Sequence, residues 1–262
     1  TINGRKLEIP DQLVNQPLTI GARGATLQIP SASAITVATS IAGSGMLQKP
    51  GSNILTLSDT STFTGSYQVG AGTLALSALS ATGGDLVLGP GSLVYSGAST
   101  TSARNLVIAT SDRNDVGTLV LTNDLTLTGT FNGLTGGFLK LGPGKLTLNG
   151  TGSQALLNAK VERDPSYCIN RDAFGNSPTR GLRMLNIAEG TLEVGNVNQS
   201  FDWTQEAVIV GAETAVTGQT ERAAHLIINS NAAIRCGYLS IGRGNGQTST
   251  APTPLTSSVT IN

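Results

Sequence analysis

Short alternating segments separated by turn-forming residues constrain this chain more than any other feature of its sequence. Near the N-terminus each segment reads apolar, polar, apolar, and consecutive segments begin 8 to 11 residues apart. They are Leu7-Glu8-Ile9, Leu18-Thr19-Ile20, Leu27-Gln28-Ile29 and Ile35-Thr36-Val37. A period of two predicts strands with one buried face. The interval fits a strand plus a turn and is too short for a crossover helix. We therefore expect an all-β fold.

A longer phrase recurs further along the chain. Residues 45–76, GMLQKPGSNILTLSDTSTFTGSYQVGAGTLAL, are partly repeated in residues 136–153, GGFLKLGPGKLTLNGTGS. At a constant offset of 91 residues, Lys49 aligns with Lys140. Shorter phrases recur at steps of 19 and 21 residues. Stacked coils of about 20 residues, with two or three strands in each, are typical of a β-helix. The sequence predicts a single β-solenoid over residues 1–262.

The regular spacing is interrupted by residues 155–183. The phrase that begins at Gly190 matches the one that begins at Gly72 at an offset of 118, which is 27 residues more than before. This insertion carries about a quarter of the charged residues. Insertions loop out on one face of a solenoid, which is often the binding face. The candidate binding residues are Arg163, Asp164, Tyr167, Arg171 and Asp172. A solvated loop that only covers an edge is the alternative interpretation.

Charge and hydropathy narrow the classes of partner. Basic and acidic residues balance at 16 each, and the basic residues form no run or stripe. Nucleic-acid binding needs concentrated positive charge, so we expect no nucleic-acid partner. No apolar run approaches the ~20 residues of a membrane-spanning helix. The chain begins at Thr1, and we interpret it as a processed product or an excised segment.

The two cysteines, Cys168 and Cys236, lie far apart in the sequence. Their spacing fits neither a zinc site nor a redox motif. In an oxidising compartment they could form a disulfide. Two unrelated buried thiols are the alternative.

Residues able to carry catalysis are few and scattered. His225 is the sole histidine, and the alternation of residues 224–228 predicts that it points outward, away from Leu226. Residues 112–115, DRND, could hold Ca²⁺, but Asp and Asn are also common turn residues. A polysaccharide lyase or hydrolase would need charged groups gathered across adjacent coils, and Trp203 could stack on a sugar ring. We predict no catalytic, cofactor-binding or metal-ligating residue.

Residues 45–76 resemble the autotransporter-associated β-strand repeat, also called the passenger-associated transport repeat. The matching elements are Lys49-Pro50-Gly51, Leu55-Thr56-Leu57-Ser58, Thr62-Phe63-Thr64-Gly65 and Ala71-Gly72-Thr73-Leu74-Ala75-Leu76. Residues 136–153 and 184–194 resemble its two halves. The resemblance implies a right-handed parallel β-helix, a bacterial source and export to the cell surface or beyond.

These features predict a non-catalytic, extracellular β-helical rod with a structural or adhesive role at a bacterial surface. Both ends of the chain carry strand patterns, so we expect head-to-tail self-association into a fibre or contacts with neighbouring repeats of a longer chain. The insertion would bind a host-surface or polysaccharide ligand. The alternative is a polysaccharide-binding or polysaccharide-degrading, lyase-like β-helix enzyme.

Overall fold

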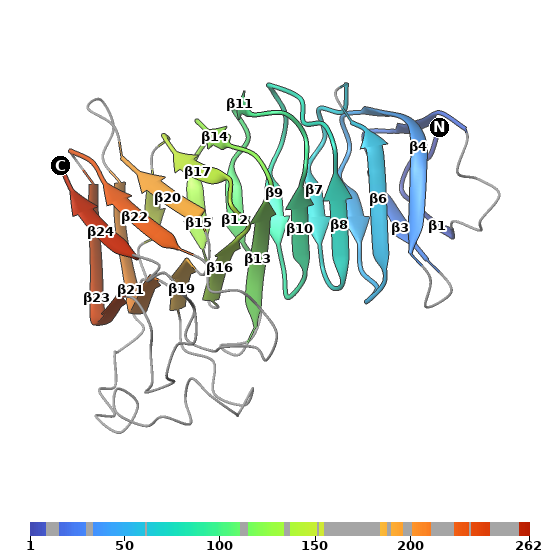
Figure 1. The fold of residues 1–262 in the computed structure, drawn as a ribbon. Coiled ribbons are helices and arrows are strands. Elements are labelled where there is room, and N and C mark those ends of the chain that lie inside the picture. The colour runs from blue at the N-terminus through green and yellow to red at the C-terminus, as the bar shows by residue number, and fades with distance from the viewer. Residues whose placement is uncertain are drawn as a thin grey trace, which may run out of the picture.

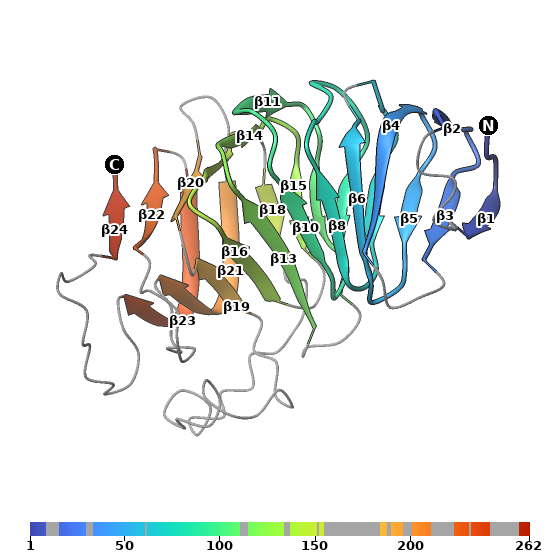
Figure 2. The same ribbon diagram turned by 45° about the vertical axis from the view of Figure 1, so that its right-hand side comes forward.

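The computed structural model is a rod of stacked strands, with the N- and C-termini at opposite ends (Figures 1 and 2). It describes residues 1–8, 16–29, 34–60, 62–110, 115–133, 137–150, 152–154, 184–187, 190–195, 201–210, 223–230, 232–241 and 257–262. Within these residues there is no helix, and all strand pairings are parallel. Successive turns of the solenoid lie about 21 residues apart. The predicted all-β parallel β-helix is therefore confirmed.

The strands form an 18-stranded and a 6-stranded sheet, which together provide three ladders along the rod. Ladder 1 contains β4 (Ile35–Gly43), β6 (Ile54–Asp59), β8 (Thr73–Leu76), β10 (Ser92–Tyr95), β13 (Val116–Leu121), β16 (Gly137–Leu141) and β19 (Met184–Ile187). Ladder 2 is the smaller sheet of β11 (Thr100–Ser102), β14 (Leu125–Leu127), β17 (Lys145–Leu148), β20 (Gly190–Val194), β22 (Ala224–Ile228) and β24 (Ser258–Ile261). Ladder 3 contains β1 (Arg5–Glu8), β3 (Ala25–Gln28), β5 (Leu47–Lys49), β7 (Tyr67–Val69), β9 (Leu86–Leu88), β12 (Leu106–Ile108), β15 (Phe131–Gly133) and β18 (Gly152–Gln154).

The chain visits the ladders in a fixed order. From β10 to β20, successive strands belong to ladders 1, 2 and 3 in turn. Two longer strands, β21 (Phe201–Val210) and β23 (Ala232–Ile241), begin in ladder 3 and continue into ladder 1. Nearer the N-terminus, β2 (Leu18–Ile20) and the end of β4 take the place of ladder 2. A turn thus contains two or three strands, as the sequence predicts.

The core consists of inward side chains stacked in register along the rod. In ladder 1, Leu55, Leu74, Leu93 and Leu119 are paired in succession, and all four are buried. Alternate residues of a strand face opposite sides, so the residues between them face outward. Burying a leucine side chain contributes roughly 1.5–3 kcal/mol. The core of the described rod is therefore built mainly from stacked aliphatic side chains.

Glycine is required where consecutive turns approach most closely, at the corner that leads into ladder 3. A Cβ atom on Gly45 would overlap the carbonyl oxygen of Gly21, and one on Gly65 would overlap the carbonyl oxygen of Gly45. The backbone itself is the neighbour in both cases, so a rotamer change could not relieve the clash. A side chain at these positions would force the turns apart.

The repeated phrase does not mark equivalent positions of the rod. Lys49 ends β5 in ladder 3, and its phrase leads into β6 in ladder 1. Lys140 lies in β16 in ladder 1, and its phrase leads into β17 in ladder 2. The offset of 91 residues is thus not a whole number of turns. The phrase specifies a strand, a corner and a strand, and this unit fits more than one corner of the rod.

Replacing Gly65 by alanine should separate adjacent turns and lower the free energy of unfolding by roughly 1–3 kcal/mol, the usual cost of overpacking. Gly51→Ala is the matched control, because a Cβ atom at Gly51 meets nothing within 4 Å, and it should stay within about 0.5 kcal/mol of the wild type. Urea unfolding at constant m-value measures both. Equal midpoints for the two variants would contradict the close approach at Gly65.

Candidate functional site

The binding site predicted from the sequence lies outside the described residues. This applies to Arg163, Asp164, Tyr167, Arg171 and Asp172, to the rest of the insertion at 155–183, to Cys168 and to the calcium candidate at 112–114. Cys236 lies in β23 and Trp203 in β21, where the strands are described without these side chains. The binding role of the insertion, the disulfide and the calcium site stay predictions.

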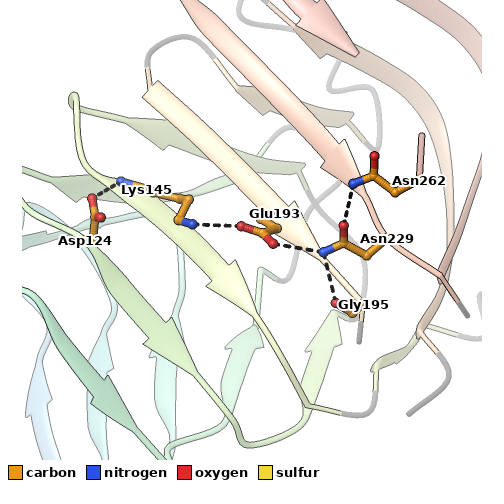
Figure 3. A network of polar contacts seen from close by, with 6 residues as sticks. All are labelled: Asp124, Lys145, Glu193, Gly195, Asn229 and Asn262. Carbon is orange, nitrogen blue, oxygen red and sulfur yellow. Dashed lines mark hydrogen bonds and ion pairs between the residues drawn. The ribbon is translucent and has the colours of Figure 1, made fainter. Parts of the chain in front are cut away.

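A polar network on ladder 2 links residues of successive turns (Figure 3). The carboxylate Oδ1 of Asp124 accepts a hydrogen bond from the backbone N–H of Lys145 at 2.9 Å. Lys145 Nζ donates to Glu193 Oε2 at 2.8 Å, and Asn229 Nδ2 donates to Glu193 Oε1 at 2.9 Å. Asn262 Nδ2 donates to Asn229 Oδ1 at 2.8 Å. The network runs along the rod.

Strand alternation places the charged pair of this network on the outer face. Lys145 and Glu193 are neighbours of Leu146 and Leu192, which face each other in register and are buried. The two charged side chains must therefore point away from the core. They lie 48 residues apart in the sequence and one turn apart in the rod. The insertion is the main cause of this separation, because most turns are about 21 residues long.

The ion pair shifts the pKa values of Lys145 and Glu193 in the directions that favour their charged forms. The hydrogen bond from Lys145 is the main cause that lowers the pKa of Glu193, with a smaller contribution from Asn229 and with burial opposing both. The hydrogen bond to Glu193 is the main cause that raises the pKa of Lys145. The Lys145 side chain is 42% exposed and that of Glu193 22%. A pair this open to solvent stabilises a fold by about 1 kcal/mol or less.

The network is suited to fastening turns together. Both carboxylate oxygens of Glu193 already accept hydrogen bonds, one from Lys145 and one from Asn229. Glycoside hydrolysis uses a pair of carboxyl groups on either side of the scissile bond, whereas this carboxylate is paired with a cation. In the described ranges, no group of three or more His, Cys, Asp and Glu side chains is arranged to hold a metal ion.

His225 takes part in the same type of contact between turns. Its Nδ1 lies 2.9 Å from Ser258 Oγ on the next strand of ladder 2. The adjacent Leu226 is buried, while the imidazole is half-buried on the outer face. The prediction that His225 points away from Leu226 is confirmed.

The interior holds an arginine that spans two turns. Arg104 is fully buried, and its Nη1 donates to the carbonyl oxygens of Gly65 at 2.5 Å and Gly84 at 3.1 Å, while Nη2 donates to that of Phe63. Its guanidinium carbon lies 5.1 Å from the ring centroid of Tyr67. Burial lowers the pKa of Arg104 and raises that of Tyr67 to about 12, although the nearby charge of Arg104 offsets part of the second shift.

Two buried lysines use backbone carbonyls in the same way. Lys49 Nζ donates to Ala71 O at 2.9 Å and also to Gly51 O. Lys140 Nζ donates to the carbonyl oxygens of Gly142 and Gly144. Burial lowers the pKa of Lys49. The sequence motif Lys49-Pro50-Gly51 predicts a turn, but Lys49 ends β5, and the alternation of that strand places it on the same face as the buried Leu47.

Comparisons with family models, with curated proteins and with solved structures found no match. In the part of the chain that the structure describes, there is no helix with the length and apolar character needed to cross a membrane.

Replacing Glu193 by glutamine should lower the free energy of unfolding at neutral pH by about 0.2–1 kcal/mol, because the ion pair is lost. The folded pKa of Glu193 lies below its ordinary value of 4.5, so its contribution is present above pH 4.5 and is lost as the pH falls through the folded pKa. The difference between the wild type and Glu193→Gln should therefore shrink on acidification, as measured by urea unfolding.

The matched control is Glu8→Gln, which removes the carboxylate of the more exposed pair Lys6–Glu8, whose N–O distance is 3.1 Å. We expect this variant to change stability less than Glu193→Gln at neutral pH. A Glu193→Gln variant that matches the wild type at neutral pH would show that the pair does not stabilise the rod.

Proposed function

We propose that this protein is a non-catalytic, extracellular β-helical rod with a structural or adhesive role at a bacterial surface. The supporting observation is that polar side chains of the described surface form hydrogen bonds between neighbouring turns at several places along the rod. Contacts in this direction oppose the separation of turns. A spacer that is pulled along its axis needs turns that resist separation, and it needs no catalytic group.

The axial contacts occur at several places on the rod. On ladder 3, Thr26 Oγ1 donates to Gln48 Oε1 at 3.0 Å, and Gln48 Nε2 donates to Gln68 Oε1 at 2.8 Å. At the corner before ladder 3, Asn105 Nδ2 donates to Asp85 Oδ1 at 2.7 Å. The Glu193 network adds the same type of contact on ladder 2 (Figure 3). These bonds supplement the parallel backbone pairing, which already joins each interior strand to two neighbours.

The surface location is supported by the resemblance of residues 45–76 to the autotransporter-associated repeat. In the rod these residues include β5, β6, β7 and β8. We infer that the chain belongs to the exported bacterial β-helices that contain such repeats.

Recognition is assigned to the insertion at residues 155–183. In the sequence it lies between β18 in ladder 3 and β19 in ladder 1, so it interrupts neither strand. The turns on either side of it remain paired, for example Leu146 with Leu192. The charged side chains of the insertion, including Arg163 and Asp164, would therefore bind a host-surface or polysaccharide ligand without interrupting the rod.

Deleting residues 158–182 should abolish binding and leave the rod folded. The probes are immobilised bacterial and host polysaccharides and cultured host cells, with binding compared between the full chain and the deletion variant. Far-UV circular dichroism and the urea midpoint report folding, and both should be retained. Gln48→Ala with Gln68→Ala, on the outer face of β5 and β7, is the control that should bind normally. Unchanged binding by the deletion variant would refute the assignment to the insertion, and release of new sugar ends by the full chain would favour a lyase.

Self-association is proposed at the edge formed by β23 and β24. Ile241 and Ile261 are 48% and 77% exposed, and they extend the inward stacks of Val210 and Ile228. Apolar side chains that continue a core fit a further turn, supplied by a second molecule or by neighbouring repeats of a longer chain.

Electron microscopy of the purified protein should show filaments if second molecules dock at this edge. Ile241→Lys combined with Ile261→Lys should shorten or abolish them, because a charged side chain would be buried in the contact. Ile54→Lys is the matched control, since Ile54 is similarly exposed at 46% but lies in β6 within the rod. Discrete particles from the unmodified protein would contradict docking between molecules.

A further inference from the structure

The two ends of the rod carry the same tripeptide at corresponding positions of the solenoid. Residues 1–3 and 260–262 both read Thr-Ile-Asn. Ile261 ends β24, the last described strand of ladder 2. Ile2 forms a parallel bridge with Ile20 of β2, which takes the place of ladder 2 in the N-terminal turns. The two tripeptides therefore run in the same direction at opposite ends of the rod (Figures 1 and 2).

At the N-terminal end, Ile2 uses both of its backbone groups on the following turn. Its N–H donates to Thr19 O at 2.8 Å, and its carbonyl accepts from Gly21 N at 2.6 Å. Neighbouring residues of a strand direct their backbone groups to opposite sides. The carbonyl of Thr1 and the N–H of Asn3 therefore face away from the rod, where they can pair with a further strand.

At the C-terminal end, the edge of β24 presents the complementary groups. Asn262 N donates to the carbonyl of Ile228 at 2.9 Å, and Ile228 lies in register with Ile261. The residues that flank Ile261 thus bond to β22, so the N–H and carbonyl of Ile261 itself face the open edge. A strand with the free groups of the N-terminal end continues this ladder in its own phase when Ile2 lies in register with Ile261.

The corner asparagines give this stack a direction (Figure 3). The Glu193 carboxylate can only accept, so Asn229 donates to it through Nδ2 and presents Oδ1 to Asn262, whose Nδ2 donates at 2.8 Å. Asn3 Oδ1 accepts from the backbone N–H of Arg23, in its own next turn, at 2.8 Å. Within the described part of the chain, Asn262 Oδ1 and Asn3 Nδ2 take part in no hydrogen bond. An acceptor at one end of the rod thus matches a donor at the other.

We propose that two copies of this chain dock head to tail, with residues 1–3 of one copy paired in parallel with β24 of the other, Ile2 on Ile261 and Asn3 on Asn262. Asn3 then repeats toward Asn262 the contact that Asn262 makes with the preceding turn. An interface between two different surfaces of a molecule does not close on itself, so it repeats into a filament. The inference rests on the self-association proposed above and specifies its partner surface and register.

The same docking covers apolar side chains of ladder 3. The chain enters ladder 3 after the corner at both ends, through β1 and through the first half of β23. Leu7 in β1 and Ile234 in β23 are half-buried and pack against the core. A second copy removes their remaining exposed surface from water, which favours association.

Disulfide trapping tests the register. All chains carry serine in place of Cys168 and Cys236; one preparation carries Thr1→Cys and a second Thr260→Cys. Both threonines are exposed, and the proposed pairing sets their Cα atoms about 4.8 Å apart, which suits a disulfide. Under mild oxidation, the mixed preparations should form covalent dimers roughly tenfold faster than a mixture of Thr1→Cys with Ser258→Cys, because that pair would be about 8 Å apart. Non-reducing electrophoresis measures both rates.

Asn3→Asp tests the corner contact. This variant keeps an oxygen for the backbone N–H of Arg23 but replaces the donor Nδ2 by an acceptor that faces Asn262. Sedimentation velocity should show association weakened roughly two- to tenfold, the usual effect of one lost hydrogen bond. Asn132→Asp is the matched control, because Asn132 is exposed on β15 within the rod and lies at neither end. It should associate like the wild type.

The outcomes distinguish the register from self-association itself. Single particles at every concentration, with no cross-linking of either mixture, would overturn both. Association in which Ser258→Cys cross-links as fast as Thr260→Cys, or which Asn3→Asp leaves unchanged, would overturn the register and leave docking at the edge of β23 and β24 in place. Selective cross-linking through Thr260→Cys, together with weakening by Asn3→Asp, would support the proposal. Neither measurement depends on a surface ligand.

Discussion

Every turn of this rod is held in place by the parallel backbone hydrogen bonds that it makes with the turns before and after it. This pairing fixes the register, so a side chain that points inward stacks on an inward side chain of its neighbours, as Leu55, Leu74 and Leu93 do. A slip of one residue would exchange the inner and outer faces of a whole strand. The alternation must therefore keep the same phase in every turn, whereas the outward residues and the corners are free to vary.

The same constraint explains why the interior cations bind backbone carbonyls. At the corners the backbone leaves the ladders, and carbonyl groups that point inward need another donor. Lys49, Arg104 and Lys140 supply N–H groups to such carbonyls, and Arg104 reaches the corners of two earlier turns. A long cationic side chain can cross the narrow core and bond to the corner, which an aliphatic side chain cannot do. Part of the desolvation penalty is offset in this way.

The period-two pattern was sufficient to predict the strands, because it reflects the local geometry of one strand. It predicted the buried Ile35 and Val37 and the outward His225 correctly. It could not predict which ladder a strand joins. The tetrapeptide Leu-Gly-Pro-Gly leads from ladder 3 to ladder 1 at 88–91, where Leu88 is buried, and from ladder 1 to ladder 2 at 141–144, where Leu141 is partly exposed. The Glu193 network was missed because its partners are brought together only by the stacking of turns.

A strand, corner and strand unit that fits different corners makes the rod tolerant of changes between its strands. Each turn contacts only its neighbours, so added residues at one corner leave the register elsewhere unchanged. The pairings Leu146–Leu192 and Leu148–Val194 continue the inward stacks of ladder 2 across the insertion without a change of phase. The inward residues of the ladders are thus constrained by packing, whereas the residues at the corners are free to change.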